Sequence, residues 1–184
     1  MGGAHPGPDR VVRLRPAFIF QRTAASEQRR IFAGPFVPTS VLRRGRLPVL
    51  PWPNGLRFQA LHATDAAEAY RLAVTREDAR GAYNVAAEPV IDARAAGELL
   101  GARPVPVPGR AANAALTALW HLHLVPAEPA LLDLVLGIPL LDTTRIRDDL
   151  GWRPRVSSVD AMAEVLEGMV HHAGGGTPTL APDS

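Results

Sequence analysis

The clearest pattern in the chain is an apolar run near its start that alternates with polar residues. Over Val11–Phe20, alternate positions are apolar, and Arg13 and Arg15 occupy the opposite face. Towards its end both faces become apolar, as in a strand that is covered on both sides. Pro16 has no backbone N–H to contribute to a sheet. The pattern predicts a strand over 11–20 that leaves regular pairing at Pro16.

Further elements follow from apolar periodicity along the rest of the chain. Strands or extended segments are predicted at Leu56–Ala63, Ala82–Ala86, Pro104–Val107 and Leu140–Asp142. Helices are predicted at Ser26–Phe32, Asp65–Arg76, Asp92–Leu100, 111–136 with breaks at its prolines, a stretch ending at Leu150, and Ser158–His172. Residues 21–55 otherwise read as Pro-rich loops. Strands that alternate with helices favour an α/β fold with some parallel sheet.

Capping residues help to locate three of these helix ends. Asp65 and Glu68 have the spacing of an N-cap and its capping-box partner. Thr143 or Thr144 is placed to cap the helix that ends at Leu150. Gly151 follows that helix and is expected to adopt the left-handed conformation that ends many helices.

The length of 184 residues suits one domain. Residues 1–10 are rich in Gly and Pro and are expected to be flexible, and residues 173–184 have the composition of a disordered tail. The folded domain is therefore expected to span residues 11–172.

Composition excludes several classes of function. The chain contains neither Cys nor Lys, so a thiolate nucleophile, a cysteine metal site and a lysine general base are all absent from it. The net charge is only +2, and acidic residues are interleaved with the arginines, so we expect no nucleic-acid partner; a basic RNA-binding module is the weakest alternative. No membrane-spanning run and no signal peptide are recognised, so a cytoplasmic protein is expected.

Spacing alone identifies no catalytic or metal site. His121 and His123 diverge on a helix and cannot chelate one ion together. No serine lies in a G-x-S-x-G turn. We therefore expect no metal and assign no catalytic residue.

Four segments, in order, resemble a known family. The segment Val11–Phe20 is similar to the strand that follows the catalytic helix in extended short-chain dehydrogenases/reductases, the NAD-dependent epimerase/dehydratase family. Leu56–Ala69 is similar to that family's arginine-containing strand and "His-x-x-Asp" helix start, and Gly81–Ala86 to its next strand. Leu141–Pro154 resembles the C-terminal "Asp-x-Ser/Thr-Arg … Leu-Gly-Trp-x-Pro" signature.

This resemblance implies a partial Rossmann-like fold, namely the C-terminal strands plus the substrate-binding lid helices. It also implies roles for single residues. Pro16 and Ala17 match the backbone that lies against the nicotinamide end of NAD or NADP, and Phe18 matches a side chain that faces the substrate. Arg57 matches an arginine that grips the diphosphate of nucleotide sugars, a task suited to a guanidinium. His62 and Asp65 match positions that organise the strand–helix corner, where Asp65 is expected to act as a cap.

The chain also departs from the family pattern. Gln21 replaces the usual glycine, no G-x-x-G-x-x-G turn follows a first strand, and Tyr-x-x-x-Lys is impossible without lysine. We therefore expect the substrate-side portion of such an enzyme, inactive alone and binding no cofactor by itself. The alternative is a non-catalytic ligand-binding or assembly protein that retains the lid.

The missing first half has a consequence for the strand at 11–20. Its outer edge should be unpaired, and Phe18, Ile19 and Phe20 should be partly uncovered. The expected partners are a small-molecule substrate and either an N-terminal nucleotide-binding half or a second copy of the chain.

Overall fold

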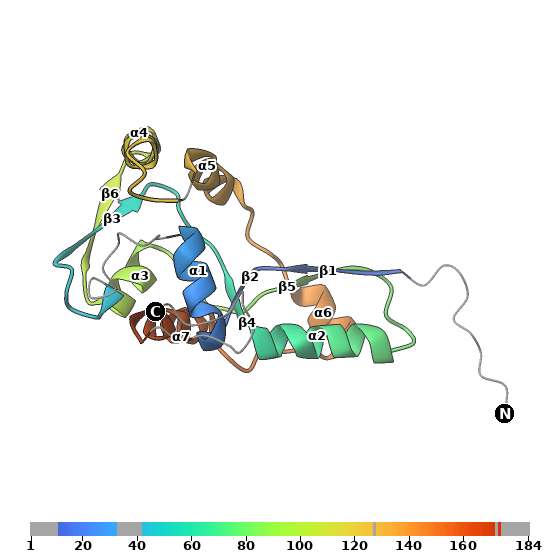
Figure 1. Cartoon of the computed structure of the whole chain (residues 1–184). Coiled ribbons are helices and arrows are strands. Elements are labelled where there is room, and N and C mark those ends of the chain that lie inside the picture. Colours follow the sequence, from blue (N-terminus) through green and yellow to red (C-terminus); the bar gives the residue numbers. More distant parts are fainter. Residues whose placement is uncertain (1–10, 33–41, 127, 172, 174–184) are drawn as a thin grey trace, which may run out of the picture.

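The computed structural model describes residues 11–32, 42–126, 128–171 and 173. It is a mixed α/β chain in which short parallel strand pairs are combined with helices (Figure 1). In chain order the elements are β1 (Val12–Pro16), β2 (Phe18–Phe20), a 3-10 turn η1 (Arg22–Ala24), α1 (Ala25–Phe32), β3 (Val49–Pro53), β4 (Ala60–His62), α2 (Ala63–Thr75), β5 (Gly81–Val85), α3 (Ala93–Leu100), β6 (Arg103–Val107), α4 (Gly109–His121), α5 (Pro129–Gly137), α6 (Thr144–Leu150) and α7 (Ser158–Val170). The predicted flexibility of 1–10 and disorder of 174–184 concern residues outside the described ranges.

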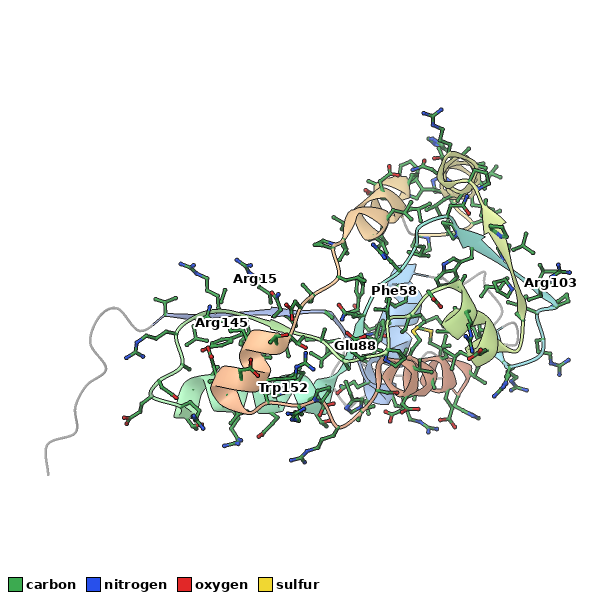
Figure 2. The ribbon with its side chains drawn as sticks, turned by 180° about the vertical axis from the view of Figure 1, so that it is seen from behind. Arg15, Phe58, Glu88, Arg103, Arg145 and Trp152 are labelled. Atoms are coloured by element: carbon green, nitrogen blue, oxygen red, sulfur yellow. The ribbon has the colours of Figure 1, made fainter. Side chains whose placement is uncertain are left out.

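The first strand pair, β1 with β5, packs one of its faces against two helices. Its register runs from Val12 opposite Gly81 to Pro16 opposite Val85. Helices α2 and α6 lie on the same side of the pair (Figures 1 and 2). They bury one core with it, made of Leu61, Ala66, Ala69, Ala79, Tyr83, Val85, Ile146, Leu150 and Trp152. Arg13 and Arg15 on the other face are exposed, as their alternation with Val12 and Leu14 in the sequence predicts.

A second pair, β2 with β4, is held against the last helix. Phe18, Ile19 and Phe20 pair with Ala60, Leu61 and His62, and α7 packs against β2, β4, η1 and α1. The buried hydroxyl of Ser158 at the start of α7 lies 3.0 Å from the carbonyl of Ala60 and accepts from the Ala60 N–H at 3.1 Å. One side chain therefore ties the helix start to the strand.

The third pair, β3 with β6, is a ribbon of two proline-containing strands next to the helical hairpin of α4 and α5 (Figure 1). The sequence predicted a loop for β3, because Pro51 and Pro53 suggest one. Pro48 and Asn54 bond to the backbone of β6 at the two ends of the ribbon. Since alternate residues of a strand bond to the same neighbour, Pro51 and Pro53 occupy positions whose N–H would point away from β6. A strand therefore forms in spite of them.

Several boundaries differ from the predicted ones. The strand predicted over Leu56–Ala63 is regular only at Ala60–His62, although Phe58 forms an isolated antiparallel bridge with Ile91. Residues 140–142 are not a strand, because their backbone is bonded by side chains instead. Gly151 does end its helix in the left-handed region, with a φ of 67°, as the sequence indicated. Gly101 ends α3 in the same way, with a φ of 64°.

Candidate functional site

The first strand changes partner at Pro16–Phe18, and a cavity opens there. Ala17 donates its N–H to the carbonyl of Val85 at 2.9 Å. From Phe18 onward the chain pairs with β4 instead. Pro16 has no N–H, but that position faces away from β5, so the β1–β5 ladder stays intact as far as Ala17. Ligands of open parallel sheets bind outside the carboxyl ends of strands, where neighbouring strands diverge.

The cavity has a volume of about 200 Å³ and is mostly apolar. It is lined by Arg15, Pro16, Ala17, Phe18, Phe58, Gln59, Ile138, Pro139 and Leu141. The Phe18 and Phe58 rings meet edge to face, with 5.6 Å between their centroids, and Phe20 stacks on Phe18 at 6.4 Å. The structure thus brings three of the predicted site residues, Pro16, Ala17 and Phe18, to one cavity with an aromatic wall.

Gln59 fixes the far wall of this cavity, and sequence reasoning missed it. Its side chain is only 4% exposed. The amide oxygen accepts from the Leu141 N–H at 2.7 Å, and the amide nitrogen donates to the Leu141 carbonyl at 3.3 Å and to Glu88 Oε1 at 2.9 Å. An amide within an otherwise apolar run was the available signal. Gln59 bonds both backbone groups of Leu141, as a neighbouring strand would.

Asp142 continues this wall into the start of α6. Its Oδ1 accepts from the Thr144 hydroxyl at 2.6 Å and from the Thr144 N–H at 2.8 Å. These two bonds, the hydroxyl bond first, lower the pKa of the Asp142 carboxyl. Thr143 is the N-cap residue of α6, as one of the two predicted positions, but its side chain makes no capping bond. The carboxylate of Asp142 accepts the Thr144 N–H instead.

The structure places Arg57 in a different cavity. Successive residues of this extended segment alternate in direction: Phe58 lines the cavity beside Phe18, whereas Arg57 lines a groove of about 430 Å³. That groove also contains Trp52, Asp92 and Arg94. Arg57 is exposed. It therefore does not share the cavity of Phe18, although both cavities adjoin the segment 56–59.

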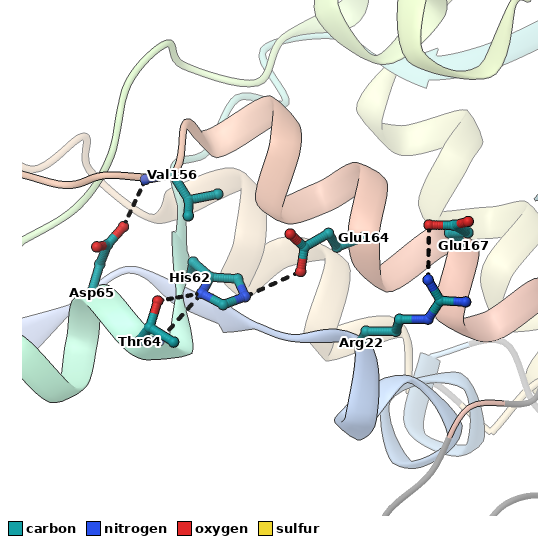
Figure 3. A network of polar contacts seen from close by, with 7 residues as sticks. All are labelled: Arg22, His62, Thr64, Asp65, Val156, Glu164 and Glu167. Atoms are coloured by element: carbon teal, nitrogen blue, oxygen red, sulfur yellow. Dashed lines mark hydrogen bonds and ion pairs between the residues drawn. The ribbon is translucent and has the colours of Figure 1, made fainter.

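The strand–helix corner after β4 is organised by His62 and Asp65 (Figure 3). His62 Nδ1 accepts from the Thr64 N–H at 3.3 Å, and His62 Nε2 lies 3.1 Å from Glu164 Oε2 on α7. His62 is therefore the N-cap of α2. The predicted capping role of Asp65 is wrong, because the helix begins at Ala63, earlier than expected.

Asp65 instead connects α2 to the chain that leads into α7. The carboxylate is buried, and its Oδ2 accepts from the N–H groups of Arg155 and Val156, both at 3.0 Å. The Trp152 indole donates to the Asp65 carbonyl at 3.0 Å. The expectation that this position organises the corner is confirmed, through contacts 90 and 91 residues away in sequence.

Neither tyrosine lies in the cavity. Tyr83 is buried, and its hydroxyl donates to Asp149 Oδ2 at 3.1 Å. Tyr70 is exposed on α2. Among the described residues, no group of three or more His, Asp or Glu side chains could hold a metal ion, and no helix is long and apolar enough to cross a membrane. The cavity therefore offers aromatic and backbone surface, but no acid/base pair of its own.

Comparison with known proteins supports the fold. No family model matches the sequence. Uncharacterised proteins of Mycobacterium tuberculosis and Mycobacterium bovis are 30% identical over 153 residues, which is 83% of this chain and 36% of theirs.

Among solved structures, the Bordetella bronchiseptica enzyme WbmG in complex with NAD and UDP matches with a TM-score of 0.53 and 18% identity, over 89% of this chain and 44% of WbmG. The UDP-N-acetylglucosamine 4-epimerase of Bacillus cereus matches with a TM-score of 0.50 and 14% identity, over 87% of this chain and 48% of that enzyme. The chain thus spans about half the length of these structures. The predicted fold class is confirmed: an α/β chain with the partial Rossmann-like fold of an extended short-chain dehydrogenase/reductase.

Proposed function

We propose that the chain is the substrate-side portion of an NAD(P)-dependent epimerase/dehydratase-type enzyme acting on a nucleotide-sugar or related hydroxyl/carbonyl substrate. The cavity at the change of partner in β1 is the observation that carries this proposal, since it lies where parallel sheets bind ligands. The likeness to WbmG and to the 4-epimerase supports it at the level of fold.

Within this proposal the cavity takes one end of a ligand. Its volume of about 200 Å³ lies below the roughly 300–1,000 Å³ of complete small-molecule pockets. Pro16 and Ala17 offer an apolar wall for the nicotinamide end of the cofactor, and Phe18 with Phe58 offers aromatic surface to the substrate. NAD(P), when bound, supplies the hydride chemistry of such enzymes. Arg57, in its separate groove, is exposed and available to the diphosphate.

We further propose that these 184 residues are inactive alone. They contain no lysine and no glycine-rich turn for a pyrophosphate. The hydroxyl of Tyr83 is engaged by Asp149, so it does not substitute for the missing acid/base pair. The full activity requires residues that this chain does not carry.

An NMR titration of the isolated chain tests the proposal. NADH should show no saturable binding below about 100 μM, which corresponds to roughly 5.5 kcal/mol. Nicotinamide mononucleotide at millimolar concentration should shift the amide resonances of Ala17, Phe18 and Phe58. Phe18→Ala should weaken that response, whereas Val74→Ala on the exposed face of α2 should not. Saturable NADH binding would refute the inactivity, and shifts confined to residues outside the cavity would refute the site.

A further inference from the structure

Helix α4 is apolar on the side that faces away from α5. Its Asn113 side chain faces α5 and donates to Asp133 on that helix at 3.0 Å, and the Thr117 hydroxyl, one turn later, donates to the Asn113 carbonyl at 2.8 Å. At about 3.6 residues per turn, the opposite side of the helix and the residue that ends it carry six apolar side chains. All six are exposed, and we call them the outer face of α4: Ala111, Ala114, Ala115, Ala118, Leu119 and Leu122.

An outer face without a polar residue differs from what a helix normally presents to water. Helix α7 shows the usual pattern, because its exposed residues are Asp160 and Glu167. On α4, by contrast, Leu122 is 67% exposed and Leu119 is 40% exposed. A helix that is apolar on all sides is normally buried, and a contiguous exposed apolar patch marks an interaction surface. The outer face of α4 therefore has the character of an interface.

The end of α4 fixes the leucines of this face. The Leu124 N–H donates to the Leu119 carbonyl and the His123 N–H to the Trp120 carbonyl, both at 2.9 Å. This bonding pattern is a Schellman motif, which brings the apolar side chains at the positions of Leu119 and Leu124 together. His123 takes the left-handed position of the motif with a φ of 57°, where glycine is usual. Leu124 is 41% exposed, so the motif adds a further leucine beside the outer face.

The outer face lies away from the cavity at Pro16–Phe18. Figure 1 shows α4 at one extremity of the molecule, with α5 on the side towards β1. The chain runs from α5 into Ile138 and Pro139, which line the cavity. Since the outer face is turned away from α5, a partner bound there leaves the cavity open.

The outer face of α4 complements itself in size. When two copies pack this face about a two-fold axis perpendicular to α4, the two helices run antiparallel and contacts are reciprocal. With the axis at the middle of the face, Ala115 lies opposite the partner's Ala118, Ala111 opposite the partner's Leu122, and Ala114 opposite the partner's Leu119. Each leucine then meets an alanine, an alternation of large and small residues that packs closely. A parallel pair would instead oppose leucine to leucine at one end and alanine to alanine at the other.

Charge also favours a second copy over a membrane. In the antiparallel pair, Arg110 at the start of α4 lies near the end of the partner's α4, where free carbonyl groups attract a cation. Between residues 109 and 140 the chain has one Arg, no Lys, and two acidic residues, Glu128 and Asp133. Helices that lie on a membrane surface are rich in Lys and Arg on their polar face. This segment lacks them.

We propose that the outer face of α4 is the interface of a homodimer, in which the α4 helices of two copies pack antiparallel about a two-fold axis. The 13 residues of α4 span about 20 Å, so the helix pair buries less than the roughly 1,600 Å² of a standard interface. The dimer is accordingly weak, with a dissociation constant on the order of 10–100 μM. This inference does not rest on the proposed function.

Sedimentation of the full chain over concentrations of about 5–500 μM tests the interface. Ala115→Glu buries a carboxylate against the partner's Ala118 and should raise the dissociation constant at least about tenfold. Its circular dichroism should be unchanged, because Ala115 is exposed in the single chain. The matched control is Val74→Glu, which places the same charge at a 73% exposed apolar position of α2 and should associate like the unaltered chain. A chain that stays monomeric throughout, or equal association of both variants, would overturn the proposal.

Disulfide trapping tests the antiparallel arrangement, since the chain has no cysteine of its own. Under a mild oxidant, a mixture of the Ala115→Cys and Ala118→Cys variants should form a cross-linked dimer, because these positions lie opposite each other. Ala111→Cys alone should not, because its two copies lie at opposite ends of the helix pair, about 16 Å apart. Absence of the first cross-link would overturn the register, and rapid cross-linking of Ala111→Cys with itself would overturn the antiparallel arrangement.

Vesicles of neutral phosphatidylcholine distinguish the dimer from a membrane-bound chain. The unaltered chain should remain in solution when the vesicles are sedimented. A monomeric chain that sediments with the vesicles, and loses that binding in Leu122→Glu, would overturn the homodimer in favour of a membrane surface.

Discussion

Replacement of Gln59 by leucine should destabilise the protein by about 2–3 kcal/mol. The side chain is 4% exposed and makes two bonds to the Leu141 backbone and one to Glu88. Leucine has a similar volume, so the change removes polar partners with little loss of packing. A buried group left without its partner costs about 1–3 kcal/mol. Leu141 is half-buried, so water can replace part of the lost hydrogen bonding. The expected loss of stability is therefore smaller than three times the cost of one unpaired group.

Urea unfolding followed by tryptophan fluorescence measures this loss, because Trp152 is buried in the main core. Amide exchange at Leu141 reports the same event locally, since its N–H loses its acceptor. Gln28→Leu is the matched control. It makes the same substitution but removes only the bond to the Ile19 carbonyl, so it should cost less than about 1 kcal/mol. A loss below about 0.5 kcal/mol in Gln59→Leu, with unchanged exchange at Leu141, would refute the view that Gln59 holds the cavity wall.

Two glycine substitutions test the packing and the helix ends. Gly151 has a φ of 67°, a conformation that strains a β-branched residue. Gly151→Val should therefore lower the free energy of unfolding by more than about 1 kcal/mol in chemical denaturation, and Gly151→Asn should lower it less. An unchanged midpoint for the valine variant would refute the strain. At Gly168, an added Cβ would lie 2.6 Å from the Ala25 Cβ, so Gly168→Ala should destabilise by about 1–3 kcal/mol through overpacking. The control is Gly137→Ala, because an added Cβ meets nothing within 4 Å there. This variant should have unchanged or higher stability. Equal effects at both glycines would show that α7 does not pack closely on α1.

Local signals in the sequence predicted the elements whose ends are set locally. Gly151 ends its helix as expected because the left-handed conformation at a helix end is a property of one residue. The strand Gly81–Val85 and the helices at Asp92–Leu100 and Ser158–His172 were recognisable for the same reason, since each carries its own periodicity and caps. The resemblance also singled out Pro16, Ala17 and Phe18, which the structure brings to one cavity.

Features that depend on distant partners could not be read from the sequence. The carboxylate of Asp65 has the spacing of a helix cap, yet it accepts from the N–H of Val156, 91 residues later. Gln59 is one amide in an apolar run until Leu141 lies beside it. The prolines of β3 suggest a loop. They fit a strand because the position of each missing N–H faces away from β6, and this is known only from the register of the pair.

The two faces of β1 differ in the side chains that they carry. Parallel strands are normally covered on both faces. Within the part of the chain that the structure describes, α2 and α6 cover one face of β1 and β5, and the other face exposes Arg13 and Arg15. Arginine keeps its charge in water at any ordinary pH and carries an apolar stem, so this face is tolerated by solvent while the face of Val12 and Leu14 packs on the core.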